Sequence, residues 1–202
     1  MKLTFPSSVE KYIQLQCNGL KHLYECSPEV KGLRKYFDHI RPTHVLEIGA
    51  GIGRVSVFLR NYYNWDDTTF YLLDGDSGDK QVAGVNTSKD DFYNSLENAK
   101  LFCNANNLSN LVLLDAAKKI NVEAKFDLVY SFLSIGFHWP LSFYLDDIFD
   151  HLAKDCLLIF GVRSSKEKWY KEQIDSVPRS KYLIVDQISD TSKQGYLVLK
   201  RK

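Results

Sequence analysis

From Thr43 to the C-terminus, short apolar runs alternate with amphipathic stretches, and this alternation constrains the fold more than any other feature of the chain. The short runs have the length and composition of buried strands, whereas the stretches between them repeat apolar residues at helical spacing. Strands and helices in alternation pack as a mostly parallel sheet with helices on both faces. We expect an α/β fold with seven strands, at residues 43–48, 68–73, 110–114, 126–132, 156–162, 182–188 and 196–200.

The connections between these strands divide into two kinds. Apolar spacing predicts helices at 52–63, 89–106, 141–154 and 166–174. No helical pattern separates the last two strands, since residues 189–194 are mostly polar and suit a tight turn. The last two strands therefore form a hairpin, and the final strand should run antiparallel to its neighbours.

Two further helical patterns precede the first strand. One follows Pro6-Ser7-Ser8, and the second begins near Val30 and stops before Pro42. With 202 residues the chain is long enough for one substantial core and does not require two. We expect residues 1–41 to be a helical extension that caps the active site, and residues 42–202 to be one ligand-binding domain.

A glycine-rich turn follows the first strand. The segment 45–54 reads V-L-E-I-G-A-G-I-G-R, with Glu47 two residues before Gly49 and further glycines at Gly51 and Gly53. Glycine adopts backbone angles that other residues avoid, and the start of the next helix presents N–H groups to an anion or polar ligand. The pattern indicates a ligand-binding turn, although a strand-to-helix turn without a ligand has the same composition.

The glycine spacing distinguishes between ligands. A dinucleotide fingerprint, G-x-G-x-x-G, would place its third glycine at position 54, where this chain has Arg54. The observed E-x-G-x-G-x-G resembles the first motif of the class I S-adenosylmethionine-dependent methyltransferases. That resemblance implies a Rossmann-like fold with the same terminal hairpin, S-adenosylmethionine as cofactor, and contacts from Glu47 and the three glycines to the methionine end of the cofactor.

Acids end the second and third strands. Asp74 lies about 20 residues beyond the glycine turn, where a carboxylate can accept hydrogen bonds from both ribose hydroxyls of a nucleoside. The resemblance places Asp115 beside the adenine amino group and the Ala116 N–H opposite a ring nitrogen, although Asp115 at this position could equally cap the following turn. We also expect cofactor contacts from Gly75 and from Ser131 in the fourth strand.

The segment after the fourth strand should face the transferred methyl group, because ligands lie beyond the carboxyl ends of such strands. It lacks the Asn/Asp-Pro-Pro-aromatic motif of many amino-group methyltransferases and the metal-binding carboxylates of the catechol type, so we expect no metal. His138 is its one side chain that accepts a proton near neutral pH. We predict His138 as general base for a hydroxyl acceptor, with a purely structural role in its turn as the alternative.

Several regions near this edge are harder to interpret. Residues 75–88 form a long connection that could be a substrate lid or a loose surface loop. An EF-hand there is disfavoured, because Asp79 and Val85 stand where that loop requires Gly and Glu. Tyr12, Tyr24 and Arg163 are candidates for the acceptor side of the site.

Composition indicates which binding partners and which cellular compartment to expect. The 26 Lys and Arg nearly balance the 25 Asp and Glu, so a nucleic-acid substrate is disfavoured despite the terminal Lys200-Arg201-Lys202. The four cysteines contain no C-x-x-C pair, and no apolar run has the length of a signal peptide core or a membrane span. We expect a cytoplasmic enzyme without a membrane partner.

The function we predict is methyl transfer from S-adenosylmethionine to a small polar acceptor such as a saccharide, at oxygen rather than nitrogen. Two alternatives from other classes remain. One is a catalytically silent cofactor-binding subunit that serves as an interaction module. The other is a nicotinamide-dependent oxidoreductase, which Arg54 opposes.

Overall fold

A computed structural model describes residues 3–10, 32–76, 95–132, 134–135, 140–163, 167–189 and 194–202. The chain divides into two compact units. The first comprises residues 1–42 and 50–118, and the second comprises residues 43–49 and 119–202. Each unit is described by itself below.

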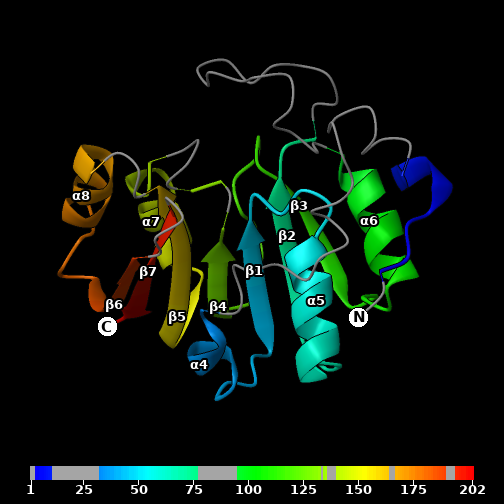
Figure 1. Ribbon diagram of the computed structural model, residues 1–202, viewed down its shortest axis with the longest axis horizontal. Coiled ribbons are helices and arrows are strands. Elements are labelled where there is room, and N and C mark those ends of the chain that lie inside the picture. Colours follow the sequence, from blue (N-terminus) through cyan, green and yellow to red (C-terminus); the bar gives the residue numbers. More distant parts are fainter. Residues whose placement is uncertain are drawn as a thin grey trace. The chain divides into compact units, whose positions relative to one another are not determined.

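The seven predicted strands form one mixed sheet, in the order β3-β2-β1-β4-β5-β7-β6 (Figure 1). The predicted α/β fold class is confirmed, including the antiparallel hairpin at the C-terminus. Among the described helices, none is long and apolar enough to cross a membrane.

The second unit holds five of the strands. β1 (His44–Ile48), β4 (Phe126–Ser131) and β5 (Leu152–Arg163) are parallel neighbours, and β7 (Gln194–Arg201) runs antiparallel between β5 and β6 (Tyr182–Ser189). The unit also contains α7 (Ser142–Phe149) and α8 (Glu167–Asp175), and the α8 side chain of Gln173 accepts a hydrogen bond from the Leu141 N–H at 2.5 Å. β1 and β4 are almost wholly buried, and most of their residues apart from Glu47 and Asp127 are apolar, as is typical of strands in parallel sheets.

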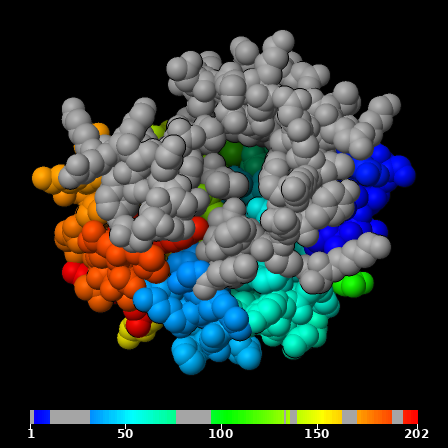
Figure 2. Space-filling view, viewed as in Figure 1, coloured from blue at the N-terminus to red at the C-terminus, as the bar shows by residue number. Residues whose placement is uncertain are grey.

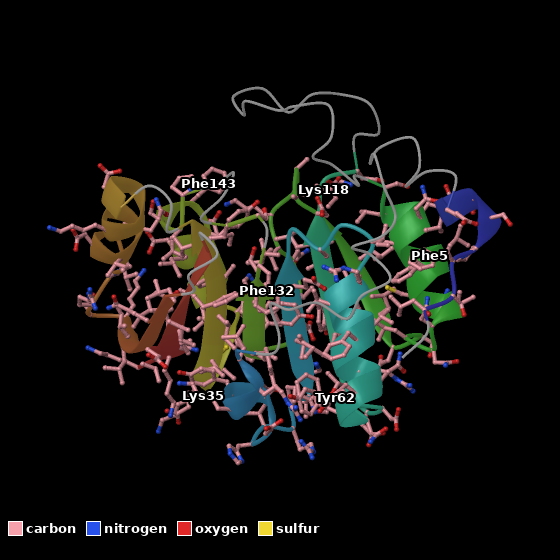
Figure 3. The ribbon with its side chains drawn as sticks, viewed as in Figure 1. Phe5, Lys35, Tyr62, Lys118, Phe132 and Phe143 are labelled. Carbon is pink, nitrogen blue, oxygen red and sulfur yellow. The ribbon has the colours of Figure 1, made fainter. Side chains whose placement is uncertain are left out.

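The first unit contains β2 (Thr69–Asp74) and β3 (Leu111–Asp115), which pair in parallel, with α4 (Arg34–Phe37), α5 (Arg54–Tyr63) and α6 (Leu96–Ala105). Tyr62 at the end of α5 is exposed. The cyan atoms in Figure 2, which have the colour of α5, form part of the visible surface of this unit. Residues near the N-terminus pack on α6: Phe5 lies beside Phe102 with ring centroids 5.1 Å apart (Figure 3). Asn106 also exchanges hydrogen bonds with the Thr4 backbone at 2.8 and 2.7 Å.

Helix ends account for most departures from the sequence-based expectations. α5 begins at Arg54 rather than 52, because Gly53 adopts a left-handed conformation as its N-cap. α6 begins at Leu96, because Ser95 is extended and its hydroxyl accepts the Asn98 N–H at 3.2 Å. Residues 89–94 of the predicted helix lie outside the described residues. The helix expected to end near residue 40 is α4, a single turn ending at Phe37.

The largest error concerns Leu152. Its spacing from Leu145 and Ile148 continues a helical pattern, and we predicted a helix through residue 154. In the structure α7 ends at Phe149, and Leu152 begins β5, where it pairs with Phe126 and is fully buried. A side chain four residues beyond Ile148 can be buried by either structure, so apolar spacing alone did not distinguish them.

Removing the Tyr182 hydroxyl is expected to destabilise the second unit. This buried hydroxyl donates to the Leu145 carbonyl at 2.6 Å and thereby joins β6 to α7. Tyr182→Phe leaves that carbonyl without its donor and should lower the free energy of unfolding by about 1–2 kcal/mol. Urea unfolding measures the loss, and Tyr62→Phe on exposed Tyr62 should cost less than about 0.5 kcal/mol. Equal losses of stability in the two variants would contradict the stabilising role of the Tyr182 hydroxyl.

Candidate functional site

The glycine turn between β1 and α5 has the backbone geometry that its sequence predicts. Gly49, Gly51 and Gly53 have φ angles of 68°, 56° and 78°, in the left-handed region that favours glycine. At two of these positions, neighbouring protein atoms also leave no space for a side chain. A Cβ on Gly49 would lie 2.1 Å from the Cβ of Ser134, and one on Gly53 would lie 2.6 Å from Leu72 Cδ1. Packing therefore explains Gly49 and Gly53 even before any ligand is considered.

Cys103 supports the same turn from α6. Its sulfur would lie 2.7 Å from a Cβ on Gly53, and its thiol donates to the Ile52 carbonyl at 3.6 Å. The sequence shows only that Cys103 lies on an apolar helix face, so its contact with the glycine turn was not predicted. Cys103 and Cys156 are both buried, and neither forms a disulfide within the part of the chain that the structure describes.

Asp74 ends β2 and its carboxylate is bound to the glycine turn. Oδ2 accepts the Gly51 N–H at 2.5 Å, and Oδ1 accepts the Gly75 N–H at 2.7 Å. Burial raises the pKa of Asp74 to about 6, although the two N–H donors act to lower it. Each carboxylate oxygen can accept more than one hydrogen bond, so the group can accept further donors from a ligand.

Asp115, at the end of β3, caps the turn that follows it. Its carboxylate accepts the Ala117 N–H at 2.9 Å and pairs with the Lys118 ammonium at 3.1 Å, and these contacts hold its pKa below the usual range. Lys118 is labelled in Figure 3. Asp115 therefore has the turn-capping role that the sequence offered as an alternative. Each of its two carboxylate oxygens keeps a further lone pair that can accept a hydrogen bond from a ligand.

The Ala116 N–H donates to the Asp74 carbonyl at 2.9 Å. An adenine ring nitrogen could receive this N–H only if that bond were given up, so the predicted Ala116 contact gains no support here. Gly75 is similarly engaged through its N–H with Asp74.

Glu47 and Ser131 lie in the second unit. Glu47 is 5% exposed, and its Oε2 accepts a hydrogen bond from the Tyr130 hydroxyl at 3.3 Å. Ser131 is fully buried, and its hydroxyl accepts the Ile135 N–H at 3.1 Å, which shapes the chain beyond β4. The Ser131 side chain therefore has a structural role, and a direct contact between that side chain and a cofactor gains no support.

Other predicted residues lie outside the part of the chain that the structure describes. These include His138 with Phe137 and Trp139, the acceptor-side candidates Tyr12 and Tyr24, the Arg163 side chain, and residues 77–88. Among the described residues, no group of three or more His, Cys, Asp or Glu is placed to hold a metal ion.

The sequence matches no protein-family profile and no curated protein. The fold, in contrast, matches many solved structures. A methyltransferase from Pyrococcus furiosus aligns with a TM-score of 0.60 at 18% identity, over 98% of this chain and 99% of that one. A ribosomal protein methylase from Lactobacillus delbrueckii subsp. bulgaricus aligns at 0.59 and 13% identity, over 100% and 82%.

A precorrin-6y methyltransferase from Geobacter metallireducens GS-15 also aligns, at 0.59 and 12% identity over 99% of this chain and 93% of that one. The fold is therefore that of the class I S-adenosylmethionine-dependent methyltransferases, as the glycine motif had suggested. The names of these similar structures give different substrates, a ribosomal protein in one and precorrin-6y in another. The shared fold therefore does not identify the methyl acceptor.

Substituting Gly53 tests the packing beneath the turn without any ligand. Gly53→Ala combines a left-handed backbone with contacts closer than 3 Å to Leu72 and Cys103, and should cost roughly 2–5 kcal/mol of unfolding free energy. Gly32→Ala is the matched control, because no atom lies within 4 Å of a Cβ there. Denaturant unfolding of both variants measures the difference. A Gly53→Ala protein as stable as Gly32→Ala would refute the packing argument.

Proposed function

We propose that this protein is an S-adenosylmethionine-dependent methyltransferase that methylates oxygen on a small polar acceptor, such as a saccharide, in the cytoplasm. The observation that carries the proposal is the Asp74 carboxylate, which is bound to the Gly51 N–H at the end of β2 and keeps unused acceptor capacity. Cys103 and Cys156 are buried thiols, which agrees with a reducing compartment.

The chain's residues fit the nucleoside part of the cofactor. Burial disfavours the charged form of Asp74 more than its two N–H donors favour that form, so its carboxylate gains from additional donors. Two vicinal ribose hydroxyls are donors of the right kind. Asp115 accepts the Ala117 N–H at Oδ1 and pairs with the Lys118 ammonium at Oδ2. Each oxygen keeps a further lone pair, and Asp115 is proposed to accept from the adenine amino group.

The cofactor supplies an activated methyl group, because its sulfonium is a good leaving group. The protein's task is then to hold the acceptor in line with the methyl carbon and sulfur and to exclude water. A hydroxyl acceptor loses its proton during the attack, and we assign His138 to receive that proton at an imidazole nitrogen.

Ligand preference is the most direct test of the proposal. Isothermal titration of the purified protein with S-adenosylmethionine, S-adenosylhomocysteine and NAD should show binding of the first two and weaker or no binding of NAD. Preference for NAD would replace the proposal with the oxidoreductase alternative. Binding without methyl transfer to any low-molecular-weight, protein or RNA fraction would favour a silent binding subunit.

Cofactor affinity should depend on the protonation of Asp74. The protonated acid accepts hydroxyl donors poorly, and its pKa is about 6 in the free protein. Affinity for S-adenosylhomocysteine should therefore fall up to about tenfold per pH unit below pH 6 and stay nearly constant above it. Titrations at pH 5 in buffers of different ionisation enthalpy should show proton release on binding, and titrations at pH 7 should show almost none.

Two substitutions identify the group responsible for this pH dependence. Asp74→Asn should weaken binding at pH 7 and abolish the decline below pH 6. Asp115→Asn should retain the decline, because Asp115 is already ionised at pH 5 owing to its contacts with the Ala117 N–H and Lys118. A decline that persists in Asp74→Asn would remove Asp74 from the ribose site.

His138→Ala tests the general base. Turnover should fall about 100-fold or more, while the dissociation constant of the cofactor changes by less than about twofold. His39→Ala, on a histidine exposed beyond α4, is the matched control and should retain both values. Equal losses of turnover and affinity in His138→Ala, or no loss, would remove the general-base role.

A further inference from the structure

A contact between β1 and β4 was not part of the predicted site. Glu47 and Tyr130 occupy directly opposed positions in the parallel pairing of these strands. The Tyr130 hydroxyl donates to Glu47 Oε2 at 3.3 Å, and both side chains are buried, with exposures of 0% and 5%. A carboxylate buried to this extent is expensive unless donors or cations stabilise it.

The Tyr130 ring is itself fixed by its neighbours. It stacks on Phe132, labelled in Figure 3, with centroids 5.3 Å apart, and Phe132 meets Tyr196 of β7 edge to face at 6.0 Å. Tyr196 pairs with Gly161 of β5. The Tyr130 ring therefore packs on Phe132, which follows β4 and is itself packed on Tyr196 of β7, and this packing restricts where the Tyr130 hydroxyl can lie.

We propose that Tyr130 is a positioning residue: its hydroxyl fixes the Glu47 carboxylate so that Glu47 binds the ammonium group of an amino-acid tail. This inference rests on the proposed function, because the amino-acid tail is that of S-adenosylmethionine. The Tyr130–Glu47 pair would thus make the protein prefer ligands that carry a zwitterionic amino-acid tail. Only the tail contact depends on the pair, and the nucleoside contacts do not.

Two ligands separate these contributions. S-adenosylhomocysteine carries the amino-acid tail, whereas 5′-methylthioadenosine has the same nucleoside and no tail. Tyr130→Phe removes one oxygen and keeps the ring that stacks on Phe132. The variant should bind S-adenosylhomocysteine about fivefold more weakly, and its affinity for methylthioadenosine should change by less than about twofold.

Tyr182→Phe is the matched control, since it removes another buried tyrosine hydroxyl of the same unit, one that donates to the Leu145 carbonyl. It should lower stability and leave the ratio of the two affinities unchanged. All titrations are run in about 1 M trimethylamine N-oxide, which favours the folded state of any weakened variant.

A double-mutant cycle with Glu47→Gln tests whether Tyr130 acts through Glu47. In the Glu47→Gln background, Tyr130→Phe should change the affinity for S-adenosylhomocysteine by less than about twofold. A full fivefold loss in that background would overturn the positioning role.

The remaining outcomes are distinct. Equal weakening of both ligands by Tyr130→Phe, or no weakening of either, overturns the inference while the proposed function stands. A wild-type protein that binds neither ligand overturns the proposed function, and the inference falls with it.

Discussion

The bond between the Asp74 carboxylate and the Gly51 N–H is the interaction on which the candidate site depends. It connects the end of β2 to the middle of the glycine turn at 2.5 Å, and a second bond from the Gly75 N–H fixes the other carboxylate oxygen. A partly buried acid held in this way has a defined position and remains incompletely stabilised, as its raised pKa shows. Both properties suit the proposed role of Asp74 in accepting hydroxyl donors from a ligand, and neither depends on which acceptor is methylated.

The architecture could be predicted from the sequence because its strongest signals are local. Buried parallel strands are continuous apolar runs, and the polar stretch before β7 can be nothing longer than a hairpin turn. Helix starts were less predictable, since Gly53 and Ser95 set them through backbone conformation and a side-chain cap. Leu152 was misassigned because one apolar residue at the right spacing fits a helix or a strand equally well.

The candidate site could be predicted only in part, because several of its contacts join residues that are far apart in the sequence. Glu47, Asp74 and Asp115 belong to short motifs that directly follow or lie within strands, so their placement at strand ends follows from local sequence. The opposition of Glu47 and Tyr130 depends on the register between strands separated by 83 positions. The contact of Cys103 with Ile52 depends on how α6 packs. Likewise, the bond from the Ala116 N–H to Asp74 and the burial of Ser131 appear only once the strands are paired.

The crowding around Gly49 and Gly53 has an evolutionary consequence. Ser134, Leu72 and Cys103 occupy the space that a larger residue would need at these two positions. A descendant that had lost its chemistry would still be under selection to retain both glycines, simply to fold. Pseudoenzymes on this scaffold should therefore keep the glycine signature, and loss of the strand-end acids would reveal them more reliably.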